Sequence, residues 1–136
     1  MMRSLLRSAL TALLLLANVQ TARAGSDVTH AALSWLSLID AGNADDSWSR
    51  ASALLQQQQM PDRWQMRLKR LRDALGSVSI RSEAGVTFSK SLPGFPDGSY
   101  ATVRFQSSFL KQRDAAEAVS LRFEDGRWRP VSYSLR

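Results

Sequence analysis

Few residues in this sequence could do chemistry by themselves. There is one histidine, His30, and no cysteine, which excludes a thiol nucleophile, a disulfide framework and a cysteine metal site. Zinc sites and catalytic triads need several ligands or partners around a histidine. His30 falls in an expected first helical turn, where a surface or capping role fits better. We therefore expect no metal, no cofactor and no catalytic residue.

Carboxylates are the next candidates, because two of them in one pocket can act as acid and base. Asp45 and Asp46 are adjacent at an expected helix start, where the helix dipole favours negative charge, so we interpret them as structural. Asp40 precedes Gly42 at an expected helix end, where negative charge is disfavoured. We expect Asp40 to cap the following helix instead.

Basic side chains gather on an expected helix near residues 61–75. Arg63, Arg67 and Arg70 share one flank of it and would suit a phosphate-rich surface. The other interpretation, which we favour, is a solvated flank whose long side chains cover the rim of the core. Later in the chain Glu117 and Glu124 lie among several arginines, a pattern typical of an exposed cross-strand charge ladder.

Two tyrosines could border a ligand pocket. If a curved sheet is open at one end, Tyr100, Tyr133 and the turn-rich loop with Pro93 and Asp97 are placed to rim that opening. A tyrosine offers an apolar ring and a polar tip for such a site. The alternative is ordinary core packing with a plain hairpin loop.

The first 24 residues resemble a cleaved signal peptide. A basic start and an apolar run over residues 10–19 precede an A-x-A site at Ala22 and Ala24. The run is shorter than the roughly 20 apolar residues of a spanning helix, and no cysteine follows for lipid attachment. We expect removal of residues 1–24, export to the periplasm or outside the cell, and one mature domain over residues 25–136 with no transmembrane segment.

Charge and composition narrow the partners. The formal charge is +6, and three arginines leave with the leader, so 15 basic groups remain against 12 acidic ones, a net +3. This mild bias is not the strong basic patch of a nucleic-acid-binding protein. The four tryptophans fall on expected buried faces, which favours core packing over base stacking.

Hydrophobic periodicity predicts three helices. The first begins near Asp27 and ends at Gly42, and the second begins at Asn43 and frays over residues 56–59. The third runs from about Pro61 to Leu75, with Pro61 suited to a first turn. Its apolar stripe must be buried against another element.

The second half predicts four antiparallel strands. Val78 and Ile80 are expected to share a face, with a bulge at Gly85. Strands over about 100–109 and 116–123 follow, and Asp125-Gly126 predicts a hairpin into a last strand irregular near Pro130. Three helices followed by four strands indicate an α+β domain with a curved sheet wrapped around the helices.

A set of residues with matched spacings runs through nearly the whole mature chain: Ala32, Trp35, Leu36, Asp40 to Gly42, Ser47, Trp48, Trp64, Leu75, Gly76, Arg81, Ser91 to Gly94, Pro96 to Gly98, Tyr100, Phe105, Phe109, Trp128, Arg129 and Tyr133. In these positions the sequence resembles an exported bacterial family known as domain of unknown function 4019. The resemblance implies a cone similar to nuclear transport factor two or cystatin. It implies no catalytic residue, and this fold hosts both enzymes and binding modules.

From the sequence we expect a small non-enzymatic module that binds a small apolar or anionic ligand, or a partner protein, at the sheet opening. One alternative is a hydrolase or isomerase, which predicts a buried Asp or Glu beside a tyrosine with a raised pKa. Another is a binder of anionic envelope surfaces through the arginines of the third helix. The ligand, the partner and the oligomeric state, including a homodimer, are left open.

Overall fold

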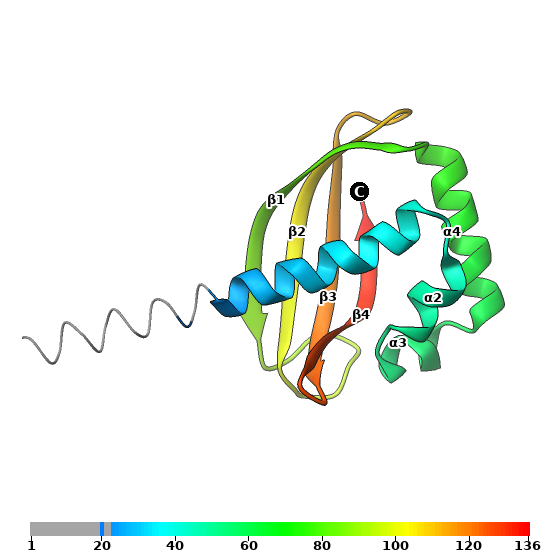
Figure 1. Cartoon of the computed structure of the whole chain (residues 1–136). Helices are drawn as coiled ribbons and strands as arrows, with labels where there is room; N and C mark the ends of the chain where they lie inside the picture. Colours follow the sequence, from blue (N-terminus) through cyan, green and yellow to red (C-terminus); the bar gives the residue numbers. More distant parts are fainter. Residues whose placement is uncertain (1–19, 21–22) are drawn as a thin grey trace, which may run out of the picture.

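The computed structural model describes residue 20 and residues 23–136, and it has an α+β architecture. An N-terminal helix over residues 23–40 precedes α2 (Ala44–Ser49), α3 (Ala53–Gln58) and α4 (Pro61–Leu75). The strands β1 (Val78–Ser89), β2 (Tyr100–Phe109), β3 (Ala115–Glu124) and β4 (Arg127–Leu135) form one antiparallel sheet in chain order. Figure 1 shows the N-terminal helix crossing the curved sheet, with α2 to α4 gathered beyond β4.

The N-terminal helix supplies much of the core. Val28, Ala32, Trp35, Leu36 and Ile39 recur at helical spacing and are buried against inward side chains of β2 and β3. The helix ends as predicted at Gly42, whose φ is +76°, and the Asn43 N–H donates to the Leu38 carbonyl at 2.8 Å. None of the described residues belongs to a helix long and apolar enough to cross a membrane.

The predicted second helix is wrong as a single element, because the chain forms the two short helices α2 and α3. Ser52 begins α3 as its N-cap, and the Ser52 N–H donates to the Pro130 carbonyl of β4 at 2.8 Å. The Gln56 side chain donates to the carbonyl of Trp48 at 3.0 Å. These contacts hold a break that helical periodicity alone does not reveal, so the described part of the chain has four helices.

Other local predictions are confirmed. Asn43 caps α2 by accepting from the Asp46 N–H at 3.3 Å, and α4 has the predicted bounds Pro61–Leu75. Asp125 and Gly126 both have positive φ, as a tight two-residue hairpin requires. The β1–β2 register shifts between Glu83 and Gly85, where the bulge was predicted.

A second register shift contradicts the prediction for the first residues of β1. It lies between Val78 and Ile80, so the predicted common face of these two residues is wrong. Ile80 is 65% exposed, and Arg81 points into the core instead. A bulge adds one residue to a strand and thereby exchanges the inward and outward sets.

The centre of the core is a tryptophan pair supported by one serine. The rings of Trp35 and Trp64 stack with centroids 5.7 Å apart. The Trp64 Nε1–H donates to the Ser47 hydroxyl at 2.9 Å, and the Trp35 Nε1–H donates to the Ser47 carbonyl at 2.7 Å. Ser47 is fully buried on α2 and therefore joins the N-terminal helix to α4.

Ser47→Ala should lower the free energy of unfolding by about 1–3 kcal/mol, because the buried Trp64 N–H would lose its acceptor. Urea denaturation followed by tryptophan fluorescence measures this. Ser49→Ala on the exposed side of α2 is the matched control and should change stability by less than about 0.5 kcal/mol. Equal effects of the two substitutions would contradict the role of Ser47.

Candidate functional site

All four strands and the N-terminal helix contribute one residue each to a buried polar network. Arg81 comes from β1, Ser107 from β2, Glu117 from β3 and Tyr133 from β4, and Asp40 is the last residue of the helix. The Glu117 side chain is completely buried. Residues far apart in the sequence therefore meet at one point under the helix end.

Arg81 is the centre of this network. Its Nε donates to Glu117 Oε1 at 2.7 Å and its Nη2 donates to Oε2 at 3.1 Å. Its Nη1 donates to Asp40 Oδ2 at 2.7 Å, and Nη2 also donates to Oδ1 at 3.1 Å. One planar guanidinium thus binds two carboxylates in a bidentate manner, a geometry that lysine cannot supply.

The remaining acceptor positions of Glu117 are also occupied. The Ser107 hydroxyl donates to Oε1 and the Tyr133 hydroxyl donates to Oε2. Each carboxylate oxygen therefore accepts two hydrogen bonds inside the protein. A buried charge is tolerated when it is paired and hydrogen-bonded in this way.

The network sets the protonation of its members. Burial alone would raise the pKa of Glu117, but hydrogen bonds from Arg81, Ser107 and Tyr133 and the charge of Arg81 outweigh it and lower that pKa. Burial, and then the Glu117 carboxylate, raise the pKa of the Tyr133 hydroxyl well above its usual range. Glu117 is therefore an anion and Tyr133 is a neutral donor near pH 7.

This arrangement bears on the predicted hydrolase or isomerase. A buried glutamate does lie beside a tyrosine, as that hypothesis requires, but the pKa of Glu117 is lowered rather than raised. A general acid needs a raised pKa and a free proton to give. Glu117 has neither, and both of its oxygens are occupied by hydrogen bonds, so within this network it anchors Arg81.

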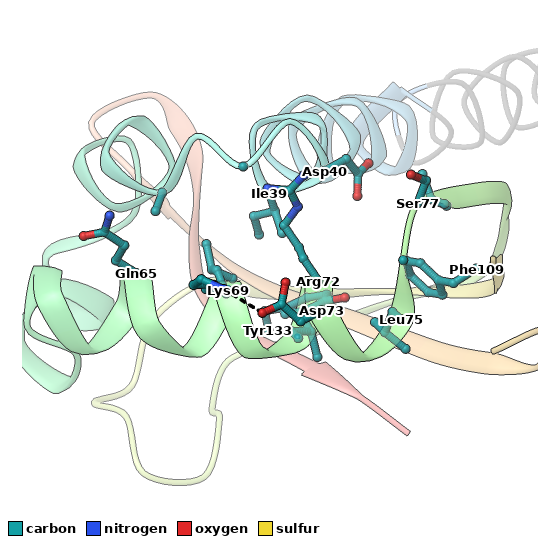
Figure 2. A pocket seen from close by; sticks show the side chains of 16 residues that line it. Ile39, Asp40, Gln65, Lys69, Arg72, Asp73, Leu75, Ser77, Phe109 and Tyr133 are labelled. Atoms are coloured by element: carbon teal, nitrogen blue, oxygen red, sulfur yellow. Dashed lines mark hydrogen bonds and ion pairs between the residues drawn. The ribbon is translucent and has the colours of Figure 1, made fainter. Parts of the chain in front are cut away.

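A pocket of about 460 Å³ lies beside the network, between the N-terminal helix and α4. Figure 2 shows Asp40 and Tyr133 at this pocket, with Arg72 reaching from α4 toward the end of the N-terminal helix. About half of its lining residues are apolar and the rest are glycines or polar and charged residues. The apolar side chains are Ile39, Ala44, Leu68, Leu71, Leu75, Val78, Phe109 and Tyr133.

The charged side chains of this pocket differ in their pairing. Lys69 donates to Asp73 at 2.7 Å, and this bond is the main cause that lowers the pKa of Asp73. Asp40 is held by Arg81. The Arg72 guanidinium lies so close to Gly42 that a Cβ there would be 2.0 Å from Nη1. Glycine at position 42 therefore permits both the helix end and the position of Arg72.

A second opening of about 620 Å³ lies near the start of the N-terminal helix and is bordered by aromatic side chains. The rings of Phe123 and Trp128 have centroids 5.2 Å apart, and Phe88 packs on Trp128 at 6.0 Å. Phe88 and Phe123 are 45% and 47% exposed. Lys90 and Asp27 supply its charges.

The structure separates the residues predicted to rim one pocket. Tyr133 lines the pocket beside the network, whereas Tyr100 lines the aromatic opening. Pro93 and Asp97 are exposed in the β1–β2 loop and line none of the three pockets found among the described residues. This loop folds over Tyr100, whose hydroxyl donates to the Pro96 carbonyl.

The three arginines of α4 do not act alike. Arg67 Nη2 donates to the Tyr133 carbonyl at 2.7 Å, and its guanidinium lies 5.6 Å from the Trp64 ring centroid. Arg63 and Arg70 are exposed. Arg67 thus supports the edge strand β4, as expected of a side chain that covers the core rim.

The predictions for two carboxylates are wrong. Asp40 does not cap α2 but binds Arg81, and Glu117 belongs to the core rather than to an exposed ladder. The sequence does place Glu117 on the inward face of β3, because it shares the two-residue alternation of the buried Ala115, Val119 and Leu121. Burial of a charge is unusual, so the sequence pattern favoured the exposed interpretation.

The remaining candidate residues from the sequence are His30 and the predicted cleavage site. His30 is exposed on the N-terminal helix, and no group of three or more potential metal ligands occurs within residues 23–136. Of the predicted cleavage site, Ala24 lies in the first turn of the N-terminal helix, and Ala22 lies outside the described residues.

Comparison with known proteins adds a family. A family model described as a protein of unknown function, DUF4019, matches residues 31–133. The matched range contains all five members of the buried network, Asp40, Arg81, Ser107, Glu117 and Tyr133. A search of curated proteins found no match.

Arg81→Met should lower the free energy of unfolding by about 3–5 kcal/mol, because Glu117 would stay buried without its cation. Combining it with Glu117→Leu should restore most of that stability, since neither charge then remains. Urea denaturation of the two single variants and the double variant measures the coupling. Additive losses would contradict a direct Arg81–Glu117 interaction.

Stability should also fall in acid because of Glu117. In the folded protein the pKa of Glu117 is below its ordinary value of 4.5, so ionised Glu117 contributes its full stabilisation above pH 4.5. This contribution is lost as the pH falls through the pKa that Glu117 has in the folded protein. The stability difference between the parent and Glu117→Gln should therefore shrink below pH 4.5. Urea midpoints measured at several pH values test this, and a difference independent of pH would contradict it.

Proposed function

The chain belongs to the DUF4019 family of proteins of unknown function, and from that premise we propose that it is an exported, non-enzymatic module that binds a small ligand. The binding site is the pocket between the N-terminal helix and α4. The main support for this proposal is the position of the pocket beside the Arg81 network. Hydrogen bonds of the network hold Asp40 and Tyr133, two residues that line the pocket.

Several features of the pocket support ligand binding. Its volume of about 460 Å³ lies in the range of small-molecule sites. Apolar side chains from the N-terminal helix, α2, α4, β1, β2 and β4 supply about half of the lining residues, and polar and charged groups converge on the same space. A site held by rigid elements loses little freedom when a ligand enters, which favours affinity.

A non-catalytic role is supported by the state of the buried carboxylate. Glu117 is ionised, enclosed and fully hydrogen-bonded, so it has no proton to transfer. The alternative of binding an anionic envelope surface through α4 has less support, because Arg67 is occupied by the Tyr133 carbonyl and the Trp64 ring. Two exposed arginines remain on that flank.

Export is supported by the leader-like composition and by the position of the first core residue. Among the described residues before position 28, none is buried, and Val28 is fully buried. Cleavage after Ala24 would therefore leave the core intact. We further propose that the curved sheet with a helix across it belongs with the cones similar to nuclear transport factor two and cystatin.

Native mass spectrometry of the protein, isolated gently from the periplasm of its own host, tests the proposal. The chain should have the mass of residues 25–136 and carry a reproducible small-molecule mass. Ser77→Trp should lose that extra mass because a large ring would fill the pocket that Ser77 lines. Ser79→Trp, on an exposed residue outside the pocket, is the matched control and should keep it.

Three outcomes would overturn parts of this proposal. An extra mass retained by Ser77→Trp would place the ligand elsewhere. A bare chain in all samples would favour a partner-binding role without a small ligand. A full-length mass of 15.1 kDa would contradict removal of the leader.

A further inference from the structure

One cationic side chain of the pocket beside the network has no carboxylate partner among the described residues. Asp40 is bound by Arg81 at 2.7 Å, and Lys69 and Asp73 bind each other at 2.7 Å. Within residues 23–136 no acidic group lies within ion-pair distance of Arg72. Arg72 is therefore the charged group of this pocket that a ligand can pair with.

The position of Arg72 directs it at the pocket. It belongs to the last turn of α4, and its guanidinium extends across to Gly42 at the end of the N-terminal helix. Figure 2 shows this side chain spanning the space between the two helices. The C-terminal end of the N-terminal helix is the negative end of its dipole and attracts the Arg72 guanidinium. This attraction leaves the N–H groups of Arg72 free to donate.

The two cationic side chains on this side of the pocket keep hydrogen-bond donors that no described residue uses. No hydrogen bond from the Arg72 side chain to another described residue is present, and the Lys69 ammonium uses one of its three donors on Asp73. The carboxylate of Asp40 faces Arg81 on both oxygens. A ligand that accepts hydrogen bonds therefore fits the Arg72 side better than one that donates them.

The apolar side chains of the pocket favour a ligand with an apolar portion. Leu68, Leu71 and Leu75 line one side of the pocket at helical spacing along α4. Ile39 and Phe109 face them from the N-terminal helix and the end of β2. A molecule with an anionic head near Gly42 and an apolar tail along the leucines would satisfy both parts of the wall.

The opposing charge limits where an anion can sit. The buried network of Arg81, Asp40 and Glu117 carries a formal charge of −1, and the Asp40 side chain is 26% exposed and lines the pocket. An anion beside Asp40 would be repelled, whereas one beside Arg72 gains a bidentate partner. A cationic ligand would choose the Asp40 side instead, so cationic and anionic ligands give opposite responses to the loss of Arg72.

We propose that this pocket binds a small amphipathic monocarboxylate, with the Arg72 guanidinium as the contact for the carboxylate. This inference rests on the proposed function and adds the class of ligand. It differs from binding of an anionic surface by the exposed flank of α4, because the recognised anion is single and its tail is enclosed.

Isothermal titration calorimetry with octanoate, 1-octanol and octylamine tests the inference on the mature chain. The three probes share one tail and differ in the head. Arg72→Gln should weaken octanoate binding by about tenfold to a hundredfold, the loss expected for a charge-assisted hydrogen bond. It should change 1-octanol binding by less than about twofold. Arg70→Gln, an exposed arginine of the same helix outside the pocket, is the matched control and should change neither.

Arg72→Lys keeps the charge and should retain part of the octanoate affinity, which separates charge from a loss of folding. Thermal denaturation of each variant checks that the fold persists. Equal weakening of octanoate and 1-octanol by Arg72→Gln would overturn the carboxylate contact while leaving the pocket in place. Tighter binding of octylamine than of octanoate would overturn the ligand class. Binding of none of the probes would overturn the amphipathic site, and the mass-spectrometric test then decides separately whether another ligand occupies the pocket.

Discussion

The bidentate contacts of Arg81 with Glu117 and Asp40 hold the N-terminal helix against the sheet. Without Arg81, two carboxylates would face each other beneath the helix end with no cation between them. With it, the last residue of the N-terminal helix is joined to β1 and β3. The gain from such a contact is geometric as much as energetic, because buried ion pairs offset much of their attraction by desolvation.

The same contact places the pocket. Holding Asp40 against the sheet fixes the end of the N-terminal helix, and Gly42 then turns the chain toward α2. α4 is held on the other side by the Trp64–Ser47 bond and by Arg67 on the β4 edge. The space left between the two helix ends is thus bounded by elements that are each anchored elsewhere, and this permits a cavity without collapse of its walls.

Basic residues close in sequence have different roles in this framework. Arg67 supports a strand edge, Lys69 pairs with Asp73 one turn away, and Arg72 crosses to the neighbouring helix. Helical spacing places them on the surface of α4, but only the neighbouring elements decide what each meets. A count of positive charges on the helix therefore describes neither its stability nor its ligand preference.

Elements with local signals could be predicted from the sequence alone. Pro61 and Gly76 bound α4, and Asp125-Gly126 forms the hairpin, because backbone conformation at these residues depends mainly on their own side chains. The tertiary structure decided the break between α2 and α3 and the meeting of Asp40, Arg81 and Glu117. Those features depend on a β4 carbonyl and on a bulge that turns Arg81 inward, and both involve contacts between residues more than 25 positions apart. No local pattern encodes such contacts, since their energy exists only after the sheet has formed.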